Sequence, residues 1–259
     1  MFARKLILLT LTLALIGSAS AQELKIAAAS DLTVALEKVA VAFKKQSGIQ
    51  LKVSYGSSGH FFSDIKNGAP FDVFLSADRD YPDTLDGLGK TDRGTTIYAQ
   101  GMLVMWIAAR TGLDPAPNLS TLTSSRISKI AIANPSHAPY GRAAVAAMSH
   151  FSVYDQAKPK LVTGESVAQA VQFAESGNAE AAMIPLALAM AESLKKAGRY
   201  VIVPSDSYPP LLQAAVVLRS SENKQAAHRF VEFLRSAAAQ KIFTENGFQS
   251  LNGLQSSNK

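Results

Sequence analysis

The 259-residue chain contains no cysteine. This absence excludes a disulfide framework, a metal site built on thiolates and a lipid anchor on an N-terminal cysteine. After the first 21 residues the sequence also lacks an apolar run of about 18 residues, the length that a membrane-spanning helix needs. We therefore expect stability to come from a packed core and the processed chain not to insert into a membrane.

Clustered positive charge is also absent. The sequence has 26 Lys and Arg against 20 Asp and Glu, a formal net charge of +6, and two of the cations, Arg4 and Lys5, stand near the N-terminus. The remaining basic residues are scattered among acidic ones. Nucleic-acid binding favours a basic stripe with interleaved aromatic residues, so the sequence predicts no nucleic-acid partner.

The N-terminus has the three parts of a secretory signal peptide: Arg4 and Lys5, an uncharged apolar run over residues 6–16, and Ala19-Ser20-Ala21. We expect cleavage after Ala21, export to the periplasm and a mature chain that starts at Gln22 without a lipid anchor. The roughly 238 residues that remain are enough for two domains of ordinary size.

Short apolar segments alternate with segments of helical period along the mature chain, which predicts an α/β fold. Strands are predicted at 24–29, 49–55, 72–77, 102–108, 129–133, 161–163, 181–184, 200–203 and 211–218. Helices are predicted to follow at 32–43, as a short helix after Gly59 that carries Phe61, Phe62 and Ile65, after Gly141, at 167–174, at 186–196 and as one long helix at 221–245. Residues 78–88 have a weak helical period, and 91–99 is predicted to be a connector.

Serine or glycine stands at several strand-to-helix junctions, beginning with Ser30 and the segment Gly56–Gly59. A helix N-terminus presents unpaired backbone N–H groups and positive dipole charge, so such a junction can bind an anion. Similar junctions follow at residues 136–141 and 164–166. Capping preferences alone favour Ser30 as only a helix cap, the glycine-flanked turn at Ser57 and Ser58 needs no ligand, and Tyr140 could simply fill space in the core.

Other chemistries have weaker support. Gly56–Gly59 lacks the Gly-Lys-Ser/Thr ending of a phosphate loop, and the Gly-x-Ser-x-Gly nucleophile motif is absent. The four histidines, His60, His137, His150 and His228, show no metal-ligand spacing, which favours solvated or packed side chains over a metal centre. No nucleophile with a base is evident, so an exported hydrolase is a remote alternative, and no cofactor is predicted.

Several motifs together resemble the periplasmic molybdate-binding proteins of ABC importers, in order and over nearly the whole mature chain. They are Ala28-Ala29-Ser30-Asp31-Leu32, Tyr55-Gly56-Ser57-Ser58-Gly59, Asp72–Asp78 (DVFLSAD), Ala133-Asn134-Pro135 with Ala138-Pro139-Tyr140-Gly141, Gly164-Glu165-Ser166-Val167, Ser176–Glu180 (SGNAE), and Gln240–Phe243 with Gly247-Phe248. The resemblance implies a two-lobed, type II periplasmic binding fold in which each lobe is a mostly parallel sheet flanked by helices.

The same resemblance implies one lobe of residues 22–100 plus 209–259, a second lobe of residues 101–208, and two crossover hinge strands between them. Ser30 and Ser58 are implied as ligands through hydroxyl and backbone N–H, and Tyr140 and Val167 through backbone N–H. Molybdenum is implied only as the bound oxyanion. The implied function is a monomeric, non-enzymatic receptor that captures molybdate, and also tungstate, and delivers it to a membrane permease.

Two positions depart from the family pattern. One branch of the family uses a tyrosine hydroxyl near the position of Pro185, which this chain lacks. Asp31 places a carboxylate beside a dianion, so its side chain either turns away, towards helix N-terminal amides, or accepts a hydrogen bond from a protonated ligand. Because phosphate keeps a proton near neutral pH, Asp31 leaves phosphate open as an alternative ligand, and size leaves sulfate open.

Overall fold

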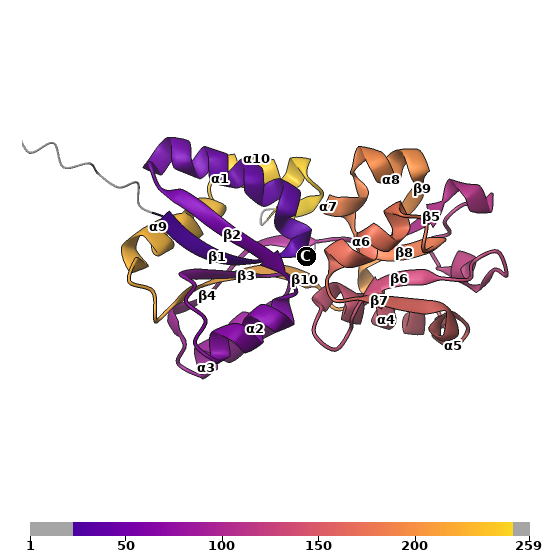
Figure 1. Ribbon diagram of the computed structural model, residues 1–259, viewed down its shortest axis with the longest axis horizontal. Helices are drawn as coiled ribbons and strands as arrows, with labels where there is room; N and C mark the ends of the chain where they lie inside the picture. Colours follow the sequence, from indigo (N-terminus) through magenta and orange to yellow (C-terminus); the bar gives the residue numbers. More distant parts are fainter. Residues whose placement is uncertain (1–22, 251–259) are drawn as a thin grey trace, which may run out of the picture.

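The computed structural model describes residues 23–250, and the predicted signal peptide lies outside this range. The described chain forms two mixed sheets flanked by helices, which lie side by side as two lobes (Figure 1). Within residues 23–250, no helix is long and apolar enough to cross a membrane.

The first lobe contains a six-stranded sheet in the order β11-β4-β10-β3-β1-β2. Its strands are β1 (Glu23–Ala29), β2 (Gln50–Gly56), β3 (Val73–Ser76), β4 (Thr91–Gly101), β10 (Leu211–Leu218) and β11 (Phe248–Ser250). β1 pairs in parallel with β2 and β3, whereas β10 and β11 make antiparallel ladders.

Helices cover both faces of this sheet, because the side chains of β1 alternate between two cores. Leu24 and Ile26 pack with α1 (Thr33–Ser47), α9 (Lys224–Leu234) and α10 (Ala237–Glu245). Ala27 faces the other way and packs with α2 (Ser58–Lys66) and α3 (Asp80–Gly87). Period-two alternation on β1 thus holds the helices in two layers, as Figure 1 shows.

The second lobe contains a five-stranded sheet in the order β7-β6-β8-β5-β9. Its strands are β5 (Leu103–Ala108), β6 (Ile130–Ala133), β7 (Leu161–Gly164), β8 (Ala181–Pro185) and β9 (Gly198–Ile202), and its helices are α4 (Pro139–His150), α5 (Tyr154–Ala157), α6 (Val167–Glu175), α7 (Leu186–Ala189) and α8 (Glu192–Ala197). Every residue of β5 is buried, as expected for a continuous apolar strand with a helix-covered sheet around it.

The chain crosses between the sheets twice. It leaves the first sheet between Gly101 and Leu103 and returns between Ile202 and Leu211, and Leu211 pairs with Gly101, so the two crossings are neighbours. The residue boundaries of the lobes stay a prediction. The parallel ladders are confined to β1–β2, β1–β3, β6–β7 and β6–β8, so both sheets are mixed rather than mostly parallel.

The prediction of a connector at 91–99 is wrong, because these residues belong to β4. Arg93 and Gly94 have positive φ angles of 67° and 73°, and the pairing of β4 with β10 shifts register twice. These irregularities interrupt the period-two pattern by which a strand is recognised in sequence.

Two predicted helices are each divided. The helix at 221–245 is α9 followed by α10, with Ser236 as the N-cap of α10 through a hydrogen bond from the N–H of Ala239 to its Oγ. The helix at 186–196 is α7 and α8, separated near Ala191, whose backbone is extended. In both places the apolar spacing continues across the break, so periodicity alone does not locate it.

Candidate functional site

The four predicted ligand residues follow strands whose carboxyl ends are neighbours. In the first lobe, Ala29 of β1 pairs with Gly56 of β2, so the segments that begin at residues 30 and 57 leave the same edge. In the second lobe, Ala133 of β6 pairs with Gly164 of β7 in the same way. Ligands of α/β folds gather at this edge, and here the two edges face each other (Figure 1).

Ser30 does not act as a helix cap. It opens a short 3-10 helix, η1 (Ser30–Leu32), whose N-cap is Ala29, and α1 begins only at Thr33. Its hydroxyl is buried and makes no hydrogen bond within residues 23–250. A buried hydroxyl without a hydrogen-bond partner lowers the stability of the fold. A ligand that accepts a hydrogen bond from Ser30 removes this penalty.

Ser58 is the first residue of α2 and is also buried. Its Oγ accepts a hydrogen bond from the N–H of Ala77 at 3.1 Å, which leaves the hydroxyl proton available. Ser57, not Ser58, is the N-cap, and its Oγ contacts His137 rather than the N–H groups of α2.

Tyr140 and Val167 stand in the first turns of α4 and α6. Tyr140 precedes Arg142, whose N–H bonds to the carbonyl of Ala138, and Val167 precedes Ala170 in α6. The N–H groups of both predicted residues therefore belong to the set that has no intrahelical acceptor. Of the predicted junction serines, only Ser166 is a side-chain cap, accepting from the N–H of Gln169.

Direct contacts join the two lobes around these residues. The N–H of Gly59 donates to the carbonyl of His137 at 2.9 Å, and the 3-10 helix η1 contacts α6. Farther along, Arg142 of α4 forms an ion pair with Asp78 and donates to the hydroxyl of Tyr81 at 3.2 Å. The structure thus brings Ser30 and Ser58 of one lobe towards Tyr140 and Val167 of the other in a closed arrangement.

Asp31 lies in a fully buried polar group that we call the hinge cluster: Asp31, Tyr98, Tyr140 and Gln213. Its Oδ2 accepts from Nε2 of Gln213 at 2.8 Å, while the Tyr140 hydroxyl interacts with it electrostatically without a well-formed hydrogen bond. The carboxyl therefore turns to the hinge, and Gln213, which lies 182 residues away, gives no local sequence signal.

Burial dominates the electrostatics of the hinge cluster. It raises the pKa of Asp31 from 3.8 to about 7, although the hydrogen bond from Gln213, the interaction with the Tyr140 hydroxyl and the backbone N–H groups oppose the shift. Burial also raises the pKa of the Tyr98 and Tyr140 hydroxyls well above their usual value, so both remain protonated. At slightly acidic pH the cluster is uncharged, and it then places no negative charge beside Ser30.

Spacing along the chain provides no reason to group the histidines, yet His60 and His137 meet at the lobe interface. Their rings stack with centroids 4.0 Å apart, and Glu165 lies against both. Burial lowers the pKa of His137, and the neighbouring His60 adds to this effect. The expectation that these histidines are merely solvated or packed is thus incomplete, because His60, His137 and Glu165 bring three potential metal-ligand atoms within 4.8 Å of one another.

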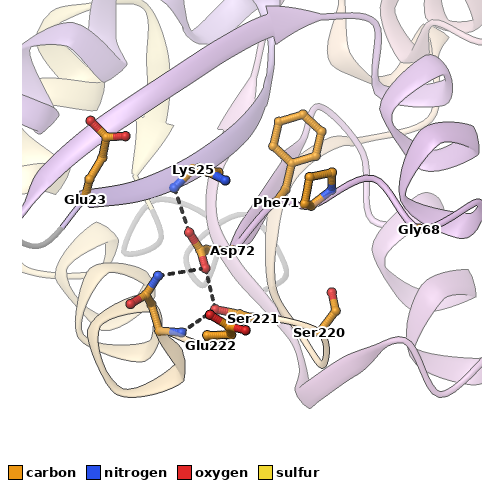
Figure 2. A pocket seen from close by; sticks show the side chains of 10 residues that line it. Glu23, Lys25, Gly68, Phe71, Asp72, Ser220, Ser221 and Glu222 are labelled. Carbon is orange, nitrogen blue, oxygen red and sulfur yellow. Dashed lines mark hydrogen bonds between the residues drawn. The ribbon is translucent and has the colours of Figure 1, made fainter.

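A pocket of about 320 Å³ lies elsewhere, in the first lobe alone (Figure 2). It opens beside Glu23 and Lys25 at the amino end of β1, the edge opposite to Ser30. The carboxylate of Asp72 accepts hydrogen bonds there from the N–H of Lys25 and the hydroxyl of Ser221 (Figure 2). Because a carboxylate lies at its centre and the donors around that carboxylate are already engaged, this pocket does not suit a small oxyanion.

Two mixed-sheet lobes, two adjacent crossings and polar donors facing each other across the interface define a two-lobed binding protein of type II. The chain belongs to the family of bacterial extracellular solute-binding proteins, which it matches over residues 24–249. It is 36% identical to the molybdate-binding protein ModA of Azotobacter vinelandii, with 89% of this chain and 91% of the relative covered. Against ModA of Rhodobacter capsulatus the identity is 35%, with 93% of each covered.

Solved structures agree with this fold. The periplasmic molybdate-binding protein of Azotobacter vinelandii superposes with a TM-score of 0.81 at 34% identity, covering 87% of this chain and 98% of that one. The sulfate-binding protein SubI of Mycobacterium tuberculosis superposes with a TM-score of 0.76 at 17% identity, covering 92% and 90%. At 17% identity, the similarity to SubI shows a shared fold and carries no information about the ligand.

Proposed function

We propose that this protein is a periplasmic receptor that captures molybdate between its two lobes. The observation that carries the proposal is the hydroxyl of Ser30, which is buried and unpartnered within the described chain and lies in a 3-10 helix that contacts α6, the helix that begins at Val167. Tyr140 lies in the first turn of α4. With Ser58, these groups offer hydrogen-bond donors and no cationic side chain. The relatives that share over a third of its residues and bind molybdate support the same ligand.

Donors alone suit an oxyanion that carries no proton at neutral pH. Molybdate, tungstate and sulfate meet this condition, whereas phosphate keeps a proton and favours a site with an acceptor. The carboxylate that adjoins Ser30 in the sequence, Asp31, is engaged by Gln213 in the hinge cluster. This orientation favours molybdate and tungstate over phosphate, and the discrimination against sulfate then rests on the size of the site.

The wider biological role follows from the same proposal. The receptor acts as a monomer, is exported by its predicted signal peptide, performs no catalysis and delivers the oxyanion to the permease of an ABC importer. Ligand contacts from both lobes stabilise the closed arrangement, which the permease distinguishes from the open one. The family match and the two-lobed fold support this role.

Thermal unfolding with separate oxyanions tests the ligand. A solute that binds only the folded protein raises its unfolding temperature by mass action. We expect a rise with molybdate and with tungstate, and none with sulfate or phosphate at equal concentration. A rise with phosphate alone would show that Asp31 accepts a hydrogen bond from the protonated ligand and that molybdate is the wrong solute.

Two serine variants test the site. Ser30→Ala and Ser58→Ala should each weaken molybdate binding at least about tenfold, the scale of one lost charge-assisted hydrogen bond. Without ligand, Ser30→Ala should leave the free energy of unfolding nearly unchanged because its hydroxyl has no internal partner. Ser58→Ala should lower it, because the N–H of Ala77 loses its acceptor.

Calorimetric titration and urea unfolding measure the two effects. Ser63→Ala, an exposed position on α2, is the matched control and should change neither quantity. Unchanged molybdate affinity in Ser30→Ala would remove that hydroxyl from the site.

A further inference from the structure

Three side chains of types that can ligate a metal, contributed by both lobes, meet at one point of the interface. His60 lies in the first turn of α2, while His137 and Glu165 lie in the loops that lead to α4 and α6. Nε2 of His137 is 3.3 Å from Oε2 of Glu165, and Nε2 of His60 is 3.6 Å from the same oxygen. One ligand atom from each residue lies within 4.8 Å of the others.

The hydrogen bonds of Ser57 assign the proton on His137. Ser57 Oγ lies 2.9 Å from the carbonyl oxygen of His137 and 2.9 Å from its Nδ1. The hydroxyl has one proton, and the carbonyl can only accept, so the hydroxyl donates to the carbonyl and Nδ1–H donates to the hydroxyl. In the neutral ring Nε2 then carries a lone pair, which faces the carboxylate of Glu165.

Nε2 of His137 and Oε2 of Glu165, both acceptors in this arrangement, face each other at 3.3 Å. A cation between or beside them would offset the repulsion of their lone pairs. Two imidazole nitrogens and a carboxylate oxygen form the ligand set of an open zinc site, where tetrahedral bonds of about 2.1 Å separate ligand atoms by about 3.4 Å. The separations to Glu165 already have this size. His60 and Glu165 have side chains 53% and 66% exposed, so both can rotate to complete the set.

Ser57 orients the His137 ring through a hydrogen bond to the ring nitrogen that does not face Glu165. A metal-bound histidine usually donates its second ring N–H to an oxygen, which orients the ring and sets its tautomer. Nδ1 of His137 makes this bond to Ser57, and Ser57 belongs to the lobe opposite to His137.

We propose that His60, His137 and Glu165 bind a divalent transition-metal ion of the zinc class, which links the two lobes in the closed arrangement. His60 comes from one lobe and the other two ligands from the second, so the complete site exists only when the lobes are closed. Each ligand lies within three residues of a proposed oxyanion ligand, Ser58, Tyr140 or Val167. The ion and the oxyanion therefore favour the same state, and each raises the affinity for the other by the same factor.

Zinc titration of the untagged mature protein, after dialysis against a chelator, tests the site without any oxyanion. We expect one Zn²⁺ to bind per chain at micromolar concentration. His60→Ala and Glu165→Gln should each weaken Zn²⁺ binding at least about tenfold. His150→Ala, an exposed histidine at the end of α4, is the matched control and should bind Zn²⁺ like the unmodified protein.

A second titration tests the link between the lobes. Saturating Zn²⁺ should raise the affinity for molybdate at least about threefold in the unmodified protein and in His150→Ala, but not in His60→Ala. With chelator present, His60→Ala should bind molybdate normally. The titration with chelator tests molybdate binding without the metal, so a failure of the proposed receptor function can be told from a failure of the metal site.

Three results would overturn the proposal. They are the absence of stoichiometric Zn²⁺ binding, Zn²⁺ binding that is unaffected by His60→Ala, and Zn²⁺ binding that leaves molybdate affinity unchanged. In the second case the ion would be held by the second lobe alone. Co²⁺ in place of Zn²⁺ adds a spectroscopic criterion, because a four-coordinate ion absorbs visible light far more strongly than a hydrated one.

Discussion

Gly59→Ala should lower molybdate affinity at least about a hundredfold, equivalent to about 2.7 kcal/mol. A Cβ atom at this position would lie 2.6 Å from the carbonyl oxygen of His137 and 2.7 Å from its Cβ. Both atoms belong to the opposite lobe, so the added methyl obstructs closure and displaces the N–H···O bond from Gly59 to His137. When the lobes are apart, His137 no longer lies beside residue 59, so the added methyl group has no clash with it.

The same variant should unfold at nearly the same urea concentration as the unmodified protein when no oxyanion is present. The Tyr81 hydroxyl, 2.6 Å from the added atom, belongs to the same lobe and can swing aside as the end of a side chain. Gly87→Ala is the matched control, because no atom lies within 4 Å of its added Cβ. If Gly59→Ala bound molybdate within twofold of the unmodified protein, the bound lobes would not pack as they do here.

Asp31→Asn should stabilise the ligand-free protein at pH 8 by several kcal/mol and much less at pH 4. Burial raises the pKa of Asp31 from 3.8 to about 7 in the folded protein. Between these values the folded chain holds a proton that the unfolded chain has lost. The free energy of unfolding therefore decreases as pH rises, by about 1.4 kcal/mol per pH unit and on the order of 4 kcal/mol in total.

Asparagine removes this dependence because it stays neutral, and its carbonyl oxygen can still accept from Gln213. Tyr98 and Gln213 belong to the same sheet as β1, so much of the burial persists when the lobes open. Urea unfolding from pH 4 to pH 8 measures the effect. Asp64→Asn, an exposed position on α2, is the control and should follow the unmodified protein. A stabilisation that is equal at every pH would show that Asp31 does not titrate in this range.

The strand-to-helix junctions were predictable because each depends on a local pattern. The strand ending at Ala29 and the helix start after Gly56–Gly59 lie close to their predicted positions, and the helix predicted after Gly141 begins two residues earlier than Gly141, at Pro139. The resemblance to molybdate-binding proteins added the choice of Ser30, Ser58, Tyr140 and Val167. The structure places these four at facing edges, while their contact with an oxyanion stays a prediction.

Long-range pairing was not predictable from local patterns. β4 is a strand because it lies between β10 and β11, although its register shifts disguise its alternation. The division of the 221–245 helix depends on Ser236 and on packing, which continuous apolar spacing does not reveal. The mixed direction of the sheets likewise follows from where the chain crosses between the lobes.

The sequence by itself determined most of the strands and the helix starts that directly follow them, because each is a property of neighbouring residues. Only the tertiary structure decided that Gln213 engages Asp31 across 182 residues, and that His60, His137 and Glu165 meet at the lobe interface. These groupings depend on how two sheets are placed against each other. Hydrogen bonds and charges act over a few ångströms in space, and separation along the chain carries no information about that distance.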